Sequence, residues 1–176
     1  MNTAVVLDFL AKGGNLLIAN SGSVGAALRE IVHEFGVTFD VNANRVFDRF
    51  HALENGITTT SFLNNDAILP NRAKYGALQY TGGPAHTVRW KNPLIQSVVT
   101  AESTAVTGKT DETAYDASKK SFATGKEISL VSTMQTKNNT RIAILSDRGM
   151  LADSVLSSTD KFILLLLFTL RFDAQI

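Results

Sequence analysis

The segment Gly13-Gly14-Asn15-Leu16-Leu17-Ile18-Ala19-Asn20-Ser21-Gly22 decides the predicted fold. Four of the five residues from Asn15 to Ala19 are apolar, and small turn-forming residues lie on both sides of them. This pattern is typical of an inner strand that is covered on both faces. We therefore predict a strand at residues 15–19 in the middle of an α/β layer, with helices before and after it.

The composition indicates one globular domain. The 176 residues are 44% hydrophobic and 19% charged, and the formal net charge is +1. This balance provides neither a basic stripe for nucleic acid nor an acidic tail. The densest basic group, Lys119, Lys120 and Lys126, is predicted to lie on a solvated loop rather than to bind phosphate.

Cysteine is absent from the chain. Its absence excludes disulfides, thiolate metal sites and a cysteine nucleophile. The three histidines, His33, His51 and His86, have no metal-ligand spacing. We therefore expect neither a bound metal nor a cofactor.

No segment of the chain has the pattern of a membrane span or a leader. The longest apolar run covers residues 162–168, and a bilayer span needs about 20 residues. Asp8 and Lys12 interrupt the first apolar run, which is not the layout of a signal peptide. The chain as written is expected to be soluble.

Hydrophobic periodicity and turn residues predict alternating helices and strands. The third helix depends on Asn92 as N-cap and Pro93 at the first helical position. The last two strands are expected to form a hairpin around residues 137–139, and residues 103–125 a long exposed connection. Helices are expected at residues 4–11, 26–35, 92–99 and 150–156, and strands at residues 15–19, 37–41, 44–50, 57–62, 75–80, 87–91, 128–135 and 141–145.

Residues 20–25, Asn-Ser-Gly-Ser-Val-Gly, follow a predicted strand and begin a helix. Nucleotide phosphates bind at this place in doubly wound folds, but the spacing matches neither glycine-rich phosphate-binding motif. N-capping by Ser21 or Ser23, with glycine in the tight turn, explains the same residues. A nucleotide or sugar-nucleotide site therefore stays an alternative interpretation.

Two acidic positions are candidates for catalysis. Asp48 with His51 would suit an acid–base pair, and a surface turn also explains them. Asp147 follows a predicted strand, where catalytic carboxylates often lie, and a helix cap explains it equally well. The chain has no nucleophile elbow and no nearby second carboxylate for paired work. We predict no catalytic residue and keep a small-molecule hydrolase as the alternative function.

Asn138-Asn139-Thr140 is an N-x-[ST] sequon on the predicted hairpin turn. It makes Asn138 a candidate for N-glycosylation. Such triplets occur often by chance, so the motif alone is weak evidence for exposure in the secretory pathway.

Three groups of residues together resemble the family of the oligosaccharyltransferase 48 kDa subunit (Wbp1). The hairpin pattern Gln-x-x-Asn-Asn-x-Arg, at residues 135–141, is the most specific part, and the likeness runs from about Ala4 to Ser158. The groups are residues 9–19 with 28–30 and 35–40; Gly82-Gly83 with Asn92-Pro93-Leu94-Ile95 and Ser103-Thr104; and residues 134–141 with Asp153-Ser154.

The resemblance implies a non-catalytic subunit of an endoplasmic-reticulum complex, which transfers a lipid-linked oligosaccharide to asparagine of nascent proteins. It implies a luminal domain in a membrane-anchored parent, with the catalytic subunit and other subunits as partners. The implied fold is an incomplete flavodoxin-like or class I glutamine amidotransferase-like layer, with a mixed sheet and flanking helices. No catalytic residues are carried over, in agreement with the missing cysteine.

Both ends depart from the family pattern. The family begins with a signal peptide and a further strand–helix unit, and it continues into β-rich domains and a C-terminal membrane helix. We therefore expect residues 1–161 to be an N-terminally truncated luminal α/β domain. Residues 162–176 do not resemble the family, and a gene-model error would explain this apolar tail.

Overall fold

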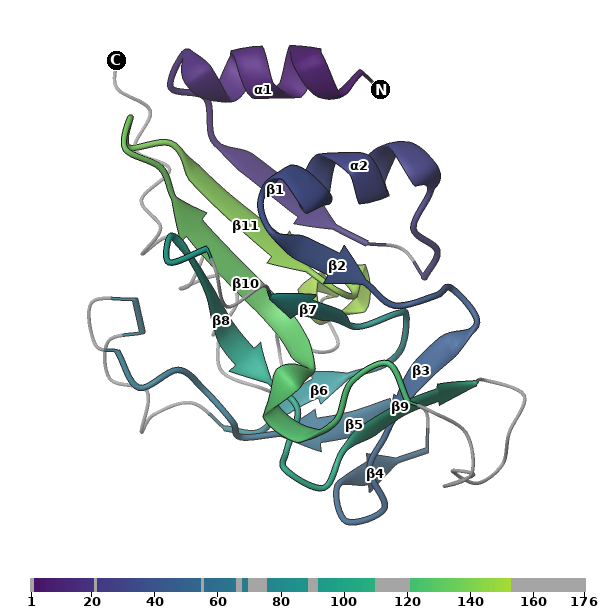
Figure 1. The fold of residues 1–176 in the computed structure, drawn as a ribbon. Helices are drawn as coiled ribbons and strands as arrows, with labels where there is room; N and C mark the ends of the chain where they lie inside the picture. The colour runs from purple at the N-terminus through teal and green to yellow at the C-terminus, as the bar shows by residue number, and fades with distance from the viewer. Residues whose placement is uncertain are drawn as a thin grey trace.

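A six-stranded mixed sheet forms the centre of the molecule, and two helices cover one of its faces (Figure 1). The computed structural model describes residues 2–20, 22–54, 56–65, 68–69, 76–88, 92–109 and 121–152. The strand order is β1-β11-β10-β7-β2, and β8 also pairs with β10. These strands are β1 (Leu16–Ala19), β2 (Val37–Phe39), β7 (His86–Val88), β8 (Ile95–Thr100), β10 (Ser129–Gln135) and β11 (Arg141–Leu145).

The predicted hairpin is confirmed as the pair β10–β11 of this sheet. β10 and β11 are antiparallel, with Gln135 opposite Arg141 and Val131 opposite Leu145. β11 also pairs in parallel with β1, so that Ile18 lies beside Ile144. The remaining pairs of this sheet are antiparallel. Two segments separated by more than 100 residues, β1 and β11, therefore lie side by side in the sheet.

The helices α1 (Thr3–Ala11) and α2 (Ala26–Glu34) form where the sequence predicts them. Gly13, with φ 92°, follows α1, and Gly36, with φ 84°, follows α2. Glycine adopts this left-handed conformation without a Cβ clash, which ends each helix. Val6 and Leu10 of α1 are buried, whereas Val5 and Phe9, which are also apolar, are exposed. The buried stripe of α1 is therefore narrower than its apolar sequence indicates.

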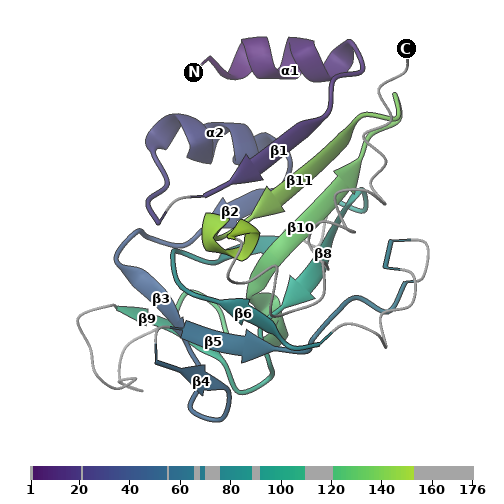
Figure 2. The same ribbon diagram turned by 180° about the vertical axis from the view of Figure 1, so that it is seen from behind.

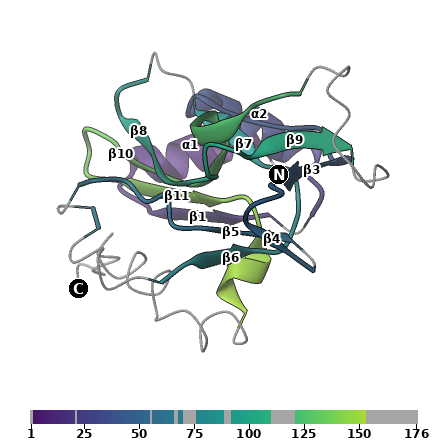
Figure 3. The same cartoon turned by 90° about the horizontal axis from the view of Figure 1, so that it is seen from below.

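Two smaller sheets and two 3₁₀ helices complete the described part of the fold. Figure 3 shows β5 and β6 on one side of the β1–β11–β10 layer and the helices on the other. The smaller sheets have the orders β3-β9 and β4-β5-β6. Their strands are β3 (Asn44–Phe47), β4 (Ala52–Leu53), β5 (Gly56–Thr59), β6 (Leu78–Tyr80) and β9 (Val106–Lys109), and the 3₁₀ helices are η2 (Gly125–Glu127) and η3 (Arg148–Leu151).

Two hydrophobic clusters lie on the two faces of the central strands. Ile142 and Ile144 of β11 belong to the cluster under the helices, with Val32 and Phe39. Ala143 and Leu145 of β11, together with further buried side chains, belong to the cluster under the smaller sheets. Because successive residues of a strand point to opposite faces, one five-residue strand supplies both clusters.

The prediction that residues 15–19 lie in the middle of the layer is wrong. β1 is the end strand of the described sheet. Of its four residues only Ile18 is buried, and Leu17 is 39% exposed. The apolar run indicated burial on both faces, but α1 and α2 cover only one face of this strand (Figure 2).

The helix predicted at residues 92–99 is also wrong, because this segment contains the strand β8. The amide oxygen of Asn92 accepts a hydrogen bond from the Leu94 N–H, which closes a local turn, and the Asn92 amide group donates to the Phe35 carbonyl. β8 begins at Ile95 and pairs along β10. Its β-branched residues suit this half-buried pleated position.

Other predicted elements are shorter than expected or fall partly outside the described residues. Residues 103–125 contain β9, η2 begins at Gly125, and Thr107 and Ala123 are buried rather than exposed. The helix predicted at residues 150–156 is the 3₁₀ helix η3, and residues 153–176 lie outside the described part. The strands predicted at 75–80 and 87–91 are observed as β6 and β7, and residues 70–75 and 89–91 are also outside.

Candidate functional site

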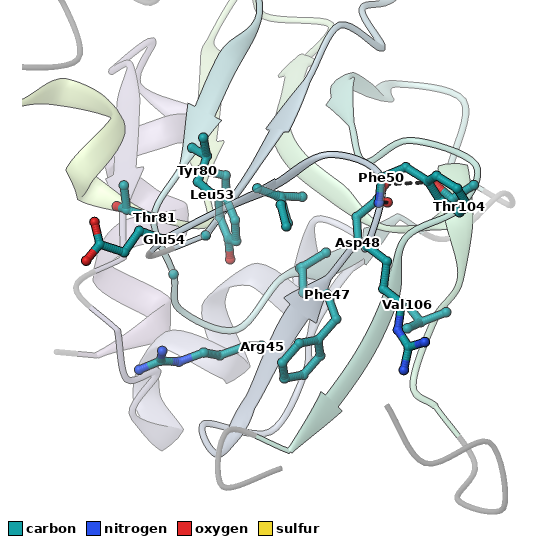
Figure 4. A pocket seen from close by; sticks show the side chains of 16 residues that line it. Arg45, Phe47, Asp48, Phe50, Leu53, Glu54, Tyr80, Thr81, Thr104 and Val106 are labelled. Carbon is teal, nitrogen blue, oxygen red and sulfur yellow. Dashed lines mark hydrogen bonds between the residues drawn. The ribbon is translucent and has the colours of Figure 1, made fainter. Parts of the chain in front are cut away.

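A pocket of about 540 Å³ lies between β3, the β4–β5 hairpin and the segments after β6 and before β9. Figure 4 shows Tyr80 and Thr81 on one side of this pocket and Asp48 with Thr104 on another. Phe50 lines the pocket, and the residue is 81% exposed. Arg45 and Arg49 bring positive charge to the same walls. The pocket therefore combines apolar surface with charged groups at its edge.

The structure brings the predicted pair Asp48 and His51 together. His51 Nδ1 lies 3.0 Å from Asp48 Oδ2. The same carboxylate oxygen accepts a hydrogen bond from the Thr104 hydroxyl at 2.8 Å, and Oδ1 accepts from the Phe50 N–H at 2.9 Å. Asp48 thus joins the loop after β3 to the segment before β9.

The electrostatics of Asp48 favour its ionised form. Burial of the carboxyl group acts to raise its pKa, but the hydrogen bonds from Thr104, the Phe50 amide and His51 outweigh burial and lower the pKa below the ordinary value. A general base works best with a pKa near the operating pH. The Asp48 carboxylate therefore suits a role in stabilising its loop through hydrogen bonds better than a role as a general base.

Side chains of the large sheet form a buried hydroxyl–imidazole cluster. Its members are His86 of β7, Ser129 and Ser132 of β10, and Ser146 after β11. His86 Nδ1 is 2.6 Å from Ser146 Oγ, and Nε2 is 2.7 Å from Ser132 Oγ. Ser129 Oγ lies 2.8 Å from Ser132 Oγ, and all four residues are fully buried. Burial lowers the pKa of His86 to about 3. The imidazole is thus neutral and shielded from any substrate in solution.

This cluster was not predicted from the sequence. Its members are 60 residues apart at the extremes, and His86 was only one of three scattered histidines. The usable signal is serine at Ser129 and Ser132, on either side of apolar Leu130 and Val131. A hydroxyl at a core position needs a partner.

Asp147 caps the short helix η3 and joins it to the segment after β6. Its Oδ1 accepts a hydrogen bond from the Gly149 N–H at 2.8 Å, and its Oδ2 accepts from the Thr81 hydroxyl at 2.7 Å. Asp147 is the N-cap of η3, as in the helix-cap interpretation of this residue from the sequence. Both oxygens are therefore engaged within the protein.

Protein groups hold the loop at residues 20–25, for which a phosphate site was the alternative interpretation. Gly25 is the N-cap of α2 and makes no side-chain cap, so capping of this helix by Ser23 is not observed; Ser21 lies outside the described residues. The Asn42 side-chain oxygen accepts a hydrogen bond from the Val24 N–H at 2.8 Å. Arg29 donates to the carbonyl oxygens of Phe39 and Asp40 at 2.8 and 2.7 Å, which fixes α2 to the end of β2.

The remaining predicted positions lie apart from one another. His33 is exposed on α2, and Asn138 is exposed on the β10–β11 turn. Lys126 is exposed in η2, whereas Lys119 and Lys120 lie outside the described residues. Within the described ranges, no three His, Cys, Asp or Glu side chains are grouped to hold a metal ion. In the same ranges, no helix is both long and apolar enough to span a bilayer.

Comparison with known proteins gives one consistent family. Residues 1–162 match the family described as OST48, N-terminal domain. The 48 kDa subunit of dolichyl-diphosphooligosaccharide–protein glycosyltransferase from Caenorhabditis elegans is 28% identical over 167 residues, covering 90% of this chain and 37% of that protein. Its Drosophila melanogaster counterpart is 32% identical over 145 residues, covering 77% and 32%. The chain thus spans about a third of the length of these relatives.

A solved structure shows the same fold. The mmIFT52 N-terminal domain superposes with a TM-score of 0.67 at 15% sequence identity, over 99% of this chain and 72% of that one. At this identity the likeness concerns the α/β architecture alone. It supports the mixed sheet with two helices as a fold that recurs in another protein.

Proposed function

This chain belongs to the family of the OST48 N-terminal domain, and on that basis we propose that it is part of a non-catalytic subunit of oligosaccharyltransferase. The complex transfers a lipid-linked oligosaccharide to asparagine side chains of nascent proteins. The observation that carries the proposal is the family match over residues 1–162. The role of this domain is assembly and stability of the complex.

The internal use of the polar groups supports an assembly role. The carboxylate oxygens of Asp48 and Asp147 accept hydrogen bonds from the protein. The imidazole of His86 is fully buried between two serine hydroxyls. Each group thereby stabilises the fold, which leaves the surface to act on partners.

The family match supports the proposed location and partners. The domain lies on the luminal side of the endoplasmic-reticulum membrane, in a full-length protein that a separate segment anchors. The partners are the catalytic subunit and other subunits of the same complex. We also propose that residues 1–161 form one luminal domain and that residues 162–176 lie outside it. The family match over residues 1–162 supports this division.

The sheet is proposed to be part of a glutamine amidotransferase-like layer. The parallel pair β1–β11 and the β1–α2–β2 unit support this finer description. The antiparallel pairs of β10 and β7 distinguish the rest of the sheet from a doubly wound arrangement.

A depletion and rescue experiment tests the function. Cells depleted of the full-length protein should underglycosylate a secreted reporter, and the full-length protein should restore the reporter and co-purify with the catalytic subunit. Rescue with normal co-purification by the full-length variants Asp48→Asn and His51→Gln would support the assembly role. Normal abundance and co-purification without rescue would instead favour chemistry at this pair.

A further inference from the structure

The turn between β10 and β11 presents the side chain of Asn138 to solvent. Thr136 and Asn139 close the turn, with the Asn139 N–H donating to the Thr136 carbonyl at 3.0 Å. Asn139 then adopts φ 63°, a left-handed conformation that asparagine tolerates. Lys137 and Asn138 are exposed at this tip. A bulky group on the Asn138 amide would therefore project away from the sheet.

Thr140, the third residue of the sequon, is hidden in the same structure. It is fully buried, and its hydroxyl donates a 2.7 Å hydrogen bond to the Leu10 carbonyl at the end of α1. That carbonyl, in the last turn of α1, also accepts a hydrogen bond from the Gly13 N–H at 3.0 Å. The neighbouring Arg141 N–H donates to the Asn15 side chain at 2.9 Å. Packing of α1 and the start of β1 thus covers the hydroxyl side of the motif.

We propose that Asn138 is N-glycosylated and that the oligosaccharide is added before α1 packs against the hairpin. The acceptor motif requires Ser or Thr at its third position, and the folded domain makes this hydroxyl inaccessible. Asn138 stays exposed in the folded domain, so the glycan persists after folding. The inference rests on the proposed luminal location.

In the glycosylation step one bond forms and one bond breaks. The Asn138 side-chain nitrogen forms a bond to the anomeric carbon of a lipid diphosphate-linked oligosaccharide. The bond from that carbon to the diphosphate oxygen breaks, the lipid diphosphate leaves with the electron pair, and the amide nitrogen loses one proton to solvent. An oligosaccharyltransferase carries out the step, so the chain is a substrate here and needs no catalytic group.

The position of the glycan also restricts where partners bind. Figures 1 and 2 show the β10–β11 turn at one end of the molecule and β4 at the other. An oligosaccharide at Asn138 would shield the first end from protein contact, because it is bulky and hydrated. The end that carries the pocket stays free for subunit contacts.

The test uses the full 176-residue chain behind a cleavable endoplasmic-reticulum leader, translated with microsomes. The readout is a gel shift that an endoglycosidase removes. We expect one shift in the wild type and in Thr140→Ser, and none in Asn138→Gln or Thr140→Val. Absence of the shift in the wild type, while a control acceptor is glycosylated, would overturn the site.

The order of events is tested with microsomes depleted of lipid-linked oligosaccharide. The donor is supplied either during translation or after the chain has become protease-resistant. We expect at least a tenfold lower yield for late supply. In Val6→Asp, which removes an apolar contact of α1, late supply should give nearly the early yield. Equal early and late yields for a protease-resistant wild-type chain would refute the order.

The leader supplies the targeting in both experiments. Failure of the shift therefore contradicts the glycosylation site alone. Failure of the full-length protein to co-purify with the catalytic subunit contradicts the proposed function alone. If the wild-type chain never becomes protease-resistant, its glycosylation yield with late donor should be nearly the early yield, as expected for Val6→Asp. A low late yield for such an unfolded chain would also refute the proposed order.

Discussion

His86 joins three parts of the large sheet through its two ring nitrogens. The Ser146 hydroxyl donates to the Ser129 carbonyl at 3.3 Å, so Ser146 Oγ is free to accept a hydrogen bond from Nδ1–H. The Ser132 hydroxyl then donates to Nε2. This assignment is inferred from the hydrogen-bond network. It keeps the imidazole neutral and gives both of its nitrogens a hydrogen-bond partner.

His86 should make the protein sensitive to mild acid. Its pKa falls from the ordinary 6.5 to about 3 on folding because of burial, so the unfolded chain binds the proton more readily. The stabilising effect is complete above pH 6.5 and is lost as the pH falls from 6.5 towards 3. Each pH unit in this window lowers the unfolding free energy by up to about 1.4 kcal/mol.

Urea unfolding at pH 7.0, 6.0 and 5.0 checks this expectation. His86→Gln should lower the stability at pH 7 by about 1–3 kcal/mol, because it disturbs two buried hydroxyls, and it should flatten the acid dependence. The same substitution at exposed His33 is the control for removal of an imidazole. An unchanged slope in His86→Gln would contradict the role of this residue.

Replacement of Arg29 by lysine should destabilise the protein. Its planar guanidinium donates to the Phe39 and Asp40 carbonyls and, at 3.0 Å, to the Asn42 side chain. A lysine ammonium is a point charge that cannot match this fork. Arg29→Lys should therefore cost about 1–3 kcal/mol of unfolding free energy.

The exposed Arg148 offers a matched control, since Arg148→Lys makes the same chemical change at a different surface position. Thermal unfolding by circular dichroism measures both variants. Equal melting temperatures for the two variants would mean that the fork contributes nothing to the docking of α2.

At the scale of elements, the start of β5 depends on a glycine. Gly56 has φ 152°, and a Cβ built on it would lie 2.0 Å from the Tyr80 carbonyl oxygen on the paired strand. That oxygen is backbone and cannot move aside without disrupting β6. Gly56→Ala should therefore cost more than about 3 kcal/mol or prevent folding.

Gly82 separates the clash from the backbone conformation. It has a similar φ of 144°, but a Cβ there would meet no atom within 4 Å. Gly82→Ala should cost only about 1–2 kcal/mol, the strain of the dihedral angle. Chemical denaturation of both variants gives the difference, and equal losses would show that the approach of Tyr80 does not limit β5.

The sequence predicted local structure well where one segment contains all the information. The β10–β11 hairpin, α1 and α2 depend on nearby turn residues and on hydrophobic spacing, and all three are observed. The helix prediction for residues 92–99 was wrong, because Asn92-Pro93 is a local helix-start signal and pairing with β10 overrides it. The edge position of β1 could not be read from its own residues, since it depends on which strands lie beside it.

The candidate site shows the same limit. Asp48 and His51 are three residues apart, and the sequence could pair them. Their third partner, Thr104, lies 56 residues away, as His86 lies far from its serines. Such contacts are created by the topology, and short motifs cannot reveal them.

At the scale of the whole molecule, the two hydrophobic clusters share the strands of one sheet. Ile144 and Leu145 are adjacent in β11 and fully buried, yet they belong to opposite clusters. Loss of either cluster would expose one face of the same hydrogen-bonded strand. The two faces should therefore unfold together rather than as separate layers.

Truncation on each face tests this cooperativity. Ile144→Ala and Leu145→Ala should each lower the unfolding free energy by about 2–5 kcal/mol, from lost burial and the cavity left behind. Far-ultraviolet and near-ultraviolet circular dichroism should give coincident melting curves for the wild type and both variants. In the exposed control Leu17→Ala the transition should move little, because Leu17 on β1 is already 39% exposed. Two separated transitions in Leu145→Ala would mean that the smaller sheets unfold on their own, and that the strands of the large sheet do not couple the two layers.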